Sequence, residues 1–341
     1  MRIISIFLVT FMVFACTQKT VEESKSLDKM TTEELDSLVN KEPENVEYLK
    51  LFGAKLLQEY RGEEALPVLA KAYRLNPKDI RIKQLYASAL INRMDKNASE
   101  VETGIAKLKE IIKKEPGNKE AFLDIATAYS YFQDYENTFK YVNEALKIDP
   151  KYRDAYTVKG RTYYKMGNMK LAKSSFETAV QQDAKFFVGY LQLGWLYTES
   201  EDYKHALEYF TTAVQLENRS TDALYGVAYS NQMLKNSDVA LQDYRNLLAV
   251  DSTYHLAYFN QAYIKQYDQM QADSAVYYYK KALALQPEFV KGWHQLGMCY
   301  LDIGNKETAL IAFKKALEYN PDYDLTKEVL IKNFKNYDPT K

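Results

Sequence analysis

Small residues recur along most of this 341-residue chain at a nearly constant spacing. They are Gly53, Ala87, Ala126, Gly160, Gly194, Ala228, Ala262 and Gly297, separated by 34, 39, 34, 34, 34, 34 and 35 residues. Self-similarity at such a period is typical of repeat architectures, in which each repeat packs only on its neighbours. The spacing therefore predicts eight repeats and a fold that is built by stacking them.

Two further sets of residues keep the same period. A second small or polar residue follows twelve positions later at Ala65, Thr138, Ala172, Ala206, Ala240 and Ala309, while Gly104 and Ala275 are displaced by insertions. Bulky side chains then recur at Leu69, Leu108, Val142, Phe176, Phe210, Tyr244, Tyr279 and Phe313. Apolar residues at i, i+3, i+4 and i+7 in both segments predict two helices per repeat, with small residues facing large ones where the helices approach.

Proline marks most of the boundaries between repeats. It stands at Pro77, Pro116, Pro150, Pro287 and Pro321, where it disfavours α geometry in the preceding residue and tolerates the start of the next helix. We therefore place the repeats at residues 46–79, 80–118, 119–152, 153–186, 187–220, 221–254, 255–289 and 290–323.

The last repeat shows the pattern most fully, with Trp293, Leu296, Gly297, Tyr300, Ala309, Phe313, Ala316 and Pro321 in order. This pattern resembles the tetratricopeptide repeat, and the resemblance covers residues 46–323. It implies an all-α fold, a right-handed α-solenoid superhelix of about eight helix pairs with a capping helix at each end.

The segments that flank the repeats suit these capping helices. Residues 31–44 begin with Thr31-Thr32-Glu33-Glu34, the sequence of a capping box, with Met30 and Leu35 placed as a hydrophobic staple. Residues 324–341 show a helical pattern with Lys-rich exposed positions, as the polar end of a solenoid requires. One long insertion, around Arg93 to Glu102, is expected to extend the turn inside the second repeat.

The first 15 residues are expected to be a signal peptide. Arg2 precedes the uncharged run Ile3 to Ala15, which has the length of a signal-peptide apolar region and is too short to span a bilayer. The following Cys16 completes Val13-Phe14-Ala15-Cys16, which resembles a lipobox, the site where bacterial lipoproteins are cleaved before a cysteine that becomes acylated. The resemblance implies a lipid on Cys16, a flexible tether over residues 16–30 and a place in the cell envelope. Because Thr17 is not Asp, the outer membrane is the expected destination by family analogy, on its periplasmic or its outer side.

The charge balance and the positions of the Cys and His residues argue against several classes of function. Lys and Arg number 45 against 46 Asp and Glu, so no basic surface favours nucleic acid. Cys299 has no disulfide partner if Cys16 is lipidated, and it is expected to be a small buried side chain. His205, His255 and His294 lie in different repeats without metal-ligand spacing, and no phosphate-binding loop or hydrolase motif occurs. We therefore expect neither catalysis nor a metal or cofactor.

The repeat pattern leaves a large aromatic content unexplained, since the chain has 30 Tyr, 15 Phe and 2 Trp. In tetratricopeptide-repeat proteins the first helix of every repeat lines the concave side, so a ligand contacts columns of side chains one repeat apart. The resemblance and the aromatic surplus place a partner-binding groove in repeats four to seven. Its expected residues are Thr157, Arg161, Tyr164, Leu191, Gln192, Trp195, Tyr225, Tyr229, Phe259, Asn260, Tyr263 and Gln266.

The expected function is a non-catalytic scaffold that holds peptide or helical segments of other envelope proteins in this groove. Two alternatives stay open. The aromatic side chains can pack internally or in a self-association interface, and Trp and Tyr faces also stack on sugars, as in glycan-binding lipoproteins of nutrient uptake. Known glycan-capturing lipoproteins with such repeats carry long insertions. As an insertion of any length this chain has only the ten-residue turn near Arg93, which favours a polypeptide ligand over a sugar.

Overall fold

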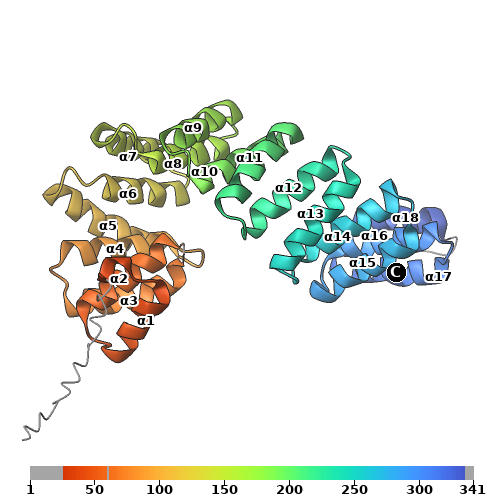
Figure 1. Ribbon diagram of the computed structural model, residues 1–341, viewed down its shortest axis with the longest axis horizontal. Coiled ribbons are helices and arrows are strands. Elements are labelled where there is room, and N and C mark those ends of the chain that lie inside the picture. Colours follow the sequence, from red (N-terminus) through yellow and green to blue (C-terminus); the bar gives the residue numbers. More distant parts are fainter. Residues whose placement is uncertain (1–25, 60, 335–341) are drawn as a thin grey trace, which may run out of the picture. The chain divides into compact units, whose positions relative to one another are not determined.

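The computed structural model describes residues 26–59 and 61–334, and in this range it contains eighteen α-helices and no strand (Figure 1). The predicted signal peptide, Cys16 and most of the predicted tether lie outside the described residues. Contacts divide the chain into two compact units, residues 1–114 and 115–341, each of which is described by itself below. None of the helices in the described range is long and apolar enough to span a bilayer.

The N-terminal unit holds a capping helix and the first two helix pairs. Its elements are a 3-10 turn at Leu27–Lys29, α1 (Thr32–Lys41), α2 (Val46–Gln58), α3 (Gly62–Leu75), α4 (Ile80–Ile91) and α5 (Ala98–Lys114). The predicted capping box is present, because Thr31 Oγ1 accepts from Glu34 N at 3.3 Å and Thr31 N donates to the Glu34 carboxylate at 2.6 Å. Leu35 is buried, and Met30 packs against the same cluster, as the predicted staple requires.

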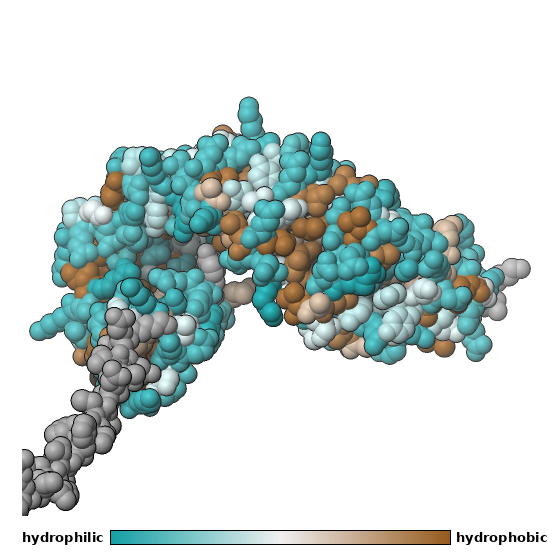
Figure 2. Space-filling view, in the orientation of Figure 1, coloured by the Kyte–Doolittle hydropathy of each residue, from teal (hydrophilic) through white to brown (hydrophobic). Residues whose placement is uncertain are grey.

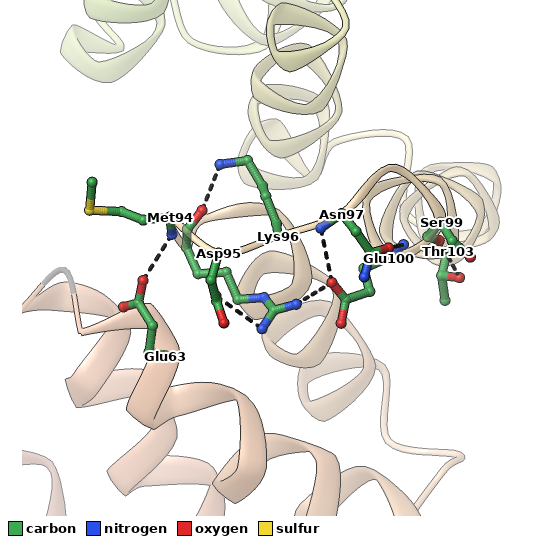
Figure 3. Close-up of polar contacts among 9 residues, drawn as sticks. Glu63, Met94, Asp95, Lys96, Asn97, Ser99, Glu100 and Thr103 are labelled. Carbon is green, nitrogen blue, oxygen red and sulfur yellow. Dashed lines mark hydrogen bonds and ion pairs between the residues drawn. The ribbon is translucent and has the colours of Figure 1, made fainter.

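The insertion in the second repeat forms a loop that is tied by polar contacts (Figure 3). The Arg93 guanidinium lies 3.1 Å from Asp95 and also pairs with Glu100. Lys96 Nζ donates to the Arg93 carbonyl oxygen at 2.6 Å, which closes the loop. The insertion extends the turn between α4 and α5, as expected, and it also lengthens α5, which begins at Ala98 and has 17 residues, where α3 has 14.

The C-terminal unit holds the other six helix pairs and a terminal helix. Its elements are α6 (Lys119–Tyr131), α7 (Tyr135–Ile148), α8 (Arg153–Lys165), α9 (Met169–Gln182), α10 (Phe187–Glu199), α11 (Tyr203–Leu216), α12 (Thr221–Met233), α13 (Ser237–Val250), α14 (His255–Tyr263), a π-helix at Ile264–Asp268, α15 (Ala272–Leu285), α16 (Val290–Asp302), α17 (Lys306–Tyr319) and α18 (Asp324–Asn333). Helices that follow each other in sequence pack together, and first helices of successive repeats also touch, as α6 and α8 do. The predicted all-α solenoid of about eight helix pairs with an extra helix at each end is confirmed.

Glycines allow the helices of the C-terminal unit to approach closely. A Cβ atom added to Gly194 on α10 would lie 2.6 Å from the Phe210 ring on α11, and one added to Gly226 on α12 would lie 2.4 Å from the same ring. Gly297 meets Phe313 in the same way at 2.5 Å. Both phenylalanines are fully buried. The rings thus fill the volume that a facing side chain would need, which is the small-against-large packing that the repeat pattern predicts.

The seventh repeat has one residue more than its neighbours, and a π-helix accommodates the extra residue. α14 ends at Tyr263 and continues through Ile264–Asp268, where the amide of Gln269 bonds to the Ile264 carbonyl at 3.1 Å. Single-turn π-helical bulges of this kind occur inside or at the end of α-helices. The next turn places Met270 at a φ of 54°, a left-handed conformation that Gly304 adopts in the following repeat.

Cys299 is expected to be unreactive while the protein is folded. Its thiol is fully buried and donates to the Ala272 carbonyl oxygen at 3.1 Å, and burial raises its pKa to about 12. Near pH 8 the group therefore stays protonated, whereas the thiolate is the form that attacks disulfide reagents. A Cys16→Ser variant leaves Cys299 as the sole thiol, and we expect it to react with an aromatic disulfide reagent in urea but not in buffer. Rapid reaction without denaturant would contradict this burial.

Candidate binding groove

The predicted groove residues lie on the first helices of four consecutive repeats, α8, α10, α12 and α14, with one residue in the π-helix that continues α14. The structure places them at different depths. Thr157, Phe259, Asn260 and Gln266 are buried. Leu191, Gln192, Trp195, Tyr225, Tyr229 and Tyr263 are partly buried, and Arg161 and Tyr164 are exposed. The accessible part of the predicted groove therefore comes mainly from α8, α10 and α12.

A pocket of about 410 Å³ lies among α8, α9 and α10. It is lined by Tyr164, Phe176, Gln192, Trp195, Leu196, Thr198 and Glu199. Three of these, Tyr164, Gln192 and Trp195, are predicted groove residues. Thr198 lies one repeat after Tyr164 in the same column. Phe176 was not predicted because the columns followed one face of the first helices, whereas Phe176 belongs to a second helix and is buried. Glu199 had a weak signal in the sequence, since it lies 35 residues after Tyr164, one position beyond a full repeat.

The polar groups of this pocket are mainly hydrogen-bond acceptors. The Glu199 carboxylate next to the Tyr164 hydroxyl raises the pKa of Tyr164. The Thr198 hydroxyl donates to the Gly194 carbonyl oxygen at 2.9 Å, so that its own oxygen is left as an acceptor. Glu199 is the one charged residue among those that line the pocket.

Aromatic rings extend from the pocket along the following repeats. The rings of Trp195 and Tyr225 lie 6.2 Å apart, and Tyr225 stacks on Tyr229 at 5.9 Å with an interplanar angle of 12°. Tyr203 meets Tyr229 edge to face at 6.3 Å. In the view of Figure 2, hydrophobic residues also gather over the region of α11 to α13. The rings thus contact one another and keep part of their surface accessible, so the structure is compatible with both packing and ligand contact.

Asn260 and Gln266 have structural hydrogen bonds. Asn260 Nδ2 donates to the Tyr244 hydroxyl at 2.9 Å and to the Tyr225 hydroxyl at 3.2 Å. The Tyr279 hydroxyl donates to Gln266 Oε1 at 2.9 Å, and Gln266 Nε2 donates to Asp302 at 2.7 Å. Burial raises the pKa of Tyr279, as expected for a phenol with no access to water. Spacing alone put these two amides in the groove, but their side chains hold successive repeats together.

Replacing Gln266 with Leu is expected to lower the free energy of unfolding by about 1–3 kcal/mol, because the Tyr279 hydroxyl is then buried without a partner. Adding Tyr279→Phe should recover most of this loss, since the orphaned hydroxyl is gone and the exposed Asp302 carboxylate is hydrated. Urea denaturation of the two single variants and the double variant measures the coupling. Additive losses would show that the two side chains are not coupled through this hydrogen bond.

A second pocket, of about 380 Å³, lies among α15, α16 and α17. It is lined by Lys280, Leu283, Ala284, Trp293, Leu296, Tyr300, Thr308, Ile311 and Ala312. Trp293 is fixed by a hydrogen bond from its Nε1 to the Pro287 carbonyl oxygen at 2.8 Å. The chain has two tryptophans, and each lines one of these pockets, so each pocket has its own fluorescent reporter.

The three histidines have separate surroundings. His205 Nδ1 lies 2.6 Å from Asp202, His294 contacts the Thr326 hydroxyl at 2.9 Å, and His255 meets the ring of Phe289 at 5.3 Å. Burial lowers the pKa of His255 and of His294. Across the described part of the chain, no group of three or more His, Cys, Asp or Glu residues is placed to bind a metal ion.

Comparison with known proteins agrees with the repeat assignment. The family described as tetratricopeptide repeat matches residues 120–152, 154–186, 189–219 and 290–323. A search of curated proteins gives no match.

Solved structures of three other proteins are similar in fold. The crystal structure of MamA protein shares 23% identity at a TM-score of 0.44, over 53% of this chain and 95% of its own. The Cut9–Hcn1 hetero-tetramer of the APC/C shares 15% identity at a TM-score of 0.60, over 89% and 58% of the two chains. The human IFIT1 dimer with m7Gppp-AAAA shares 16% identity at a TM-score of 0.54, over 84% and 76%. The matches to the family models show that the chain carries tetratricopeptide repeats.

Proposed function

We propose that the protein is a non-catalytic scaffold of the bacterial cell envelope, which binds a polypeptide segment in the groove formed by α8, α10 and α12. The observation that carries the proposal is the pocket beside Trp195 together with the partly accessible rings of Tyr225 and Tyr229. Partly buried aromatic rings next to a preformed pocket are the usual anchors for a bound segment. Gln192 and Tyr164 supply polar groups beside them that can fix its register.

A polypeptide suits this surface better than the other ligands of similar size. The IFIT1 structure is described with m7Gppp-AAAA. The net charge of −1 gives no basis for proposing such a ligand for this chain. Sugar binding by aromatic stacking remains the second candidate, and it is an outcome of the experiment below. The attachment to the envelope is proposed from the lipobox-like sequence that ends at Cys16.

The test is an affinity capture from detergent-solubilised envelopes with the full chain as bait. A Trp195→Ala/Tyr229→Ala variant removes two groove rings, and a Tyr277→Ala variant removes a ring from α15 that is 57% exposed and lies outside the groove. Both variants are first checked by circular dichroism and thermal melting. We expect defined proteins to be captured by the wild type and the Tyr277 variant, and to be lost with the double variant.

The captured protein is then mapped to a segment, which is titrated as a synthetic peptide while tryptophan fluorescence is recorded. Capture that is equal for all three baits would contradict binding in the groove. If no protein is enriched and a glycan array binds the wild type but not the double variant, the sugar-binding candidate replaces the scaffold.

A further inference from the structure

The pocket among α8, α9 and α10 has an electrostatic character that selects among polypeptide segments. Its lining contains one carboxylate, Glu199, and no Lys, Arg or His. Glu199 raises the pKa of the neighbouring Tyr164 hydroxyl, and a carboxylate has acceptor sites for several donors. Thr198 offers a further acceptor, because its own proton is donated to Gly194. A bound group that brings several N–H donors is therefore complementary to the pocket.

Two helix ends add to the negative potential. α8 ends at Lys165 and α10 ends at Glu199, so Tyr164, Thr198 and Glu199 all lie in the last turn of a helix. The C-terminal end of a helix carries a partial negative charge that favours cations within about one turn. Lys165 does not line the pocket, since its Nζ lies 3.3 Å from the carbonyl oxygen of Ser130 in the preceding repeat. Arg161 lies one turn earlier on α8 and does not line the pocket either.

The apolar part of the lining consists of aromatic rings that attract cations. Trp195 and Tyr164 line the pocket, and the Trp195 ring is held from behind by an edge-to-face contact with Phe210 at 4.8 Å. Tryptophan and tyrosine faces bind ammonium and guanidinium groups through the ring quadrupole. The volume of about 410 Å³ is sufficient for one long side chain.

We infer that this pocket receives the side chain of a lysine or arginine of the bound segment, with the cation placed between the aromatic rings and the Glu199 carboxylate. The inference rests on the proposed function, because it names the chemistry of the segment that the groove binds. It assigns Glu199, which the sequence pattern did not single out, as the residue that determines specificity.

The test uses a Trp293→Phe variant, in which Trp195 is the sole tryptophan and reports on this pocket. The probes are N-acetyl-arginine amide and N-acetyl-citrulline amide, which have nearly the same shape and differ in charge, at matched ionic strength. We expect the arginine probe to change Trp195 fluorescence at a concentration about fivefold lower than the citrulline probe. Glu199→Gln should reduce this preference to within about twofold.

Glu201→Gln is the matched control, because this carboxylate lies two residues further along and does not line the pocket. It should keep the preference for arginine, and circular dichroism should show all variants folded. Equal titration by the two probes, or a preference that survives Glu199→Gln, would overturn the assignment. These outcomes are distinct from failure of the scaffold function, because the probes test the pocket alone and the envelope capture tests the groove.

Discussion

Replacing Phe210 with Ala is expected to lower the free energy of unfolding of the C-terminal unit by about 3–5 kcal/mol. The ring is fully buried on α11, between Gly194 of α10 and Gly226 of α12. Neither glycine has a side chain that could move into the space left by the ring, so the cavity persists and the contacts of three helices are lost. The same ring supports Trp195 at 4.8 Å, so the fluorescence of the groove should change together with stability.

Urea denaturation followed by circular dichroism and by tryptophan fluorescence measures this loss. The stability of a repeat protein depends on the contacts between neighbouring repeats. A defect in the fifth repeat can therefore separate the unfolding transitions of the repeats on either side of it. Tyr277→Ala removes an aromatic ring that is 57% exposed and should stay within about 0.5 kcal/mol of the wild type. A loss below about 1 kcal/mol for Phe210→Ala would mean that α10 and α12 close around the cavity, contrary to the tight approach of the two glycines.

Gly226→Ala tests the same packing from the opposite side. Within a helix this change normally stabilises a protein by about 0.5–1 kcal/mol, because alanine has the higher helix propensity.

Here the added Cβ would meet the Phe210 ring, which has little room to retreat because it packs so closely on Gly194 that a Cβ there would lie 2.6 Å from it. We therefore expect Gly226→Ala to destabilise the protein and to lower its free energy of unfolding by about 1–3 kcal/mol. Gly117→Ala, where the added atom meets nothing within 4 Å, is the control that should remain near neutral.

Features that recur in every repeat could be predicted from the sequence. The period of 34 residues predicts the helix pairs. The contact of Gly297 with Phe313 was predictable because only a small residue fits against the ring. The capping box at Thr31 and Glu34 is local, since both partners lie within one turn of helix. Such features depend on backbone spacing and on side-chain volume, which the sequence displays directly.

The depth of the groove residues could not be predicted in this way. Column spacing treats Gln266 as equivalent to Tyr164, but Gln266 lies in the π-helix, where it is buried against Tyr279, and Tyr164 is exposed at a regular helix end. The predicted set of pocket residues was incomplete for a related reason. Phe176 lies on a second helix and reaches Trp195 only by tertiary packing. Glu199 lies on the same helix as Trp195, one turn later, but one position beyond the column.

Replacing Cys16 with Ser is expected to release the protein from membranes, provided that residues 1–15 are exchanged for a signal peptide that is cleaved without acylation, because Cys16→Ser alone also removes the lipobox cleavage site. Each methylene group that enters a bilayer contributes about 0.8 kcal/mol, and while one acyl chain binds only marginally, the several chains of a bacterial lipoprotein hold it firmly. In the producing bacterium, the wild type should therefore sediment with membranes and resist an alkaline wash, and the variant should be found in the soluble fraction.

Metabolic labelling with an alkyne fatty acid identifies the acylated residue. Label should be incorporated into the wild type and into a Cys299→Ser variant, since that second thiol is buried and hydrogen-bonded to the Ala272 carbonyl oxygen of the preceding repeat. Cys16→Ser should carry none. A Cys16→Ser protein that stays in the membrane after the wash would remove the basis for a lipid anchor. It would also require a membrane partner, bound by the repeats themselves, to explain the location.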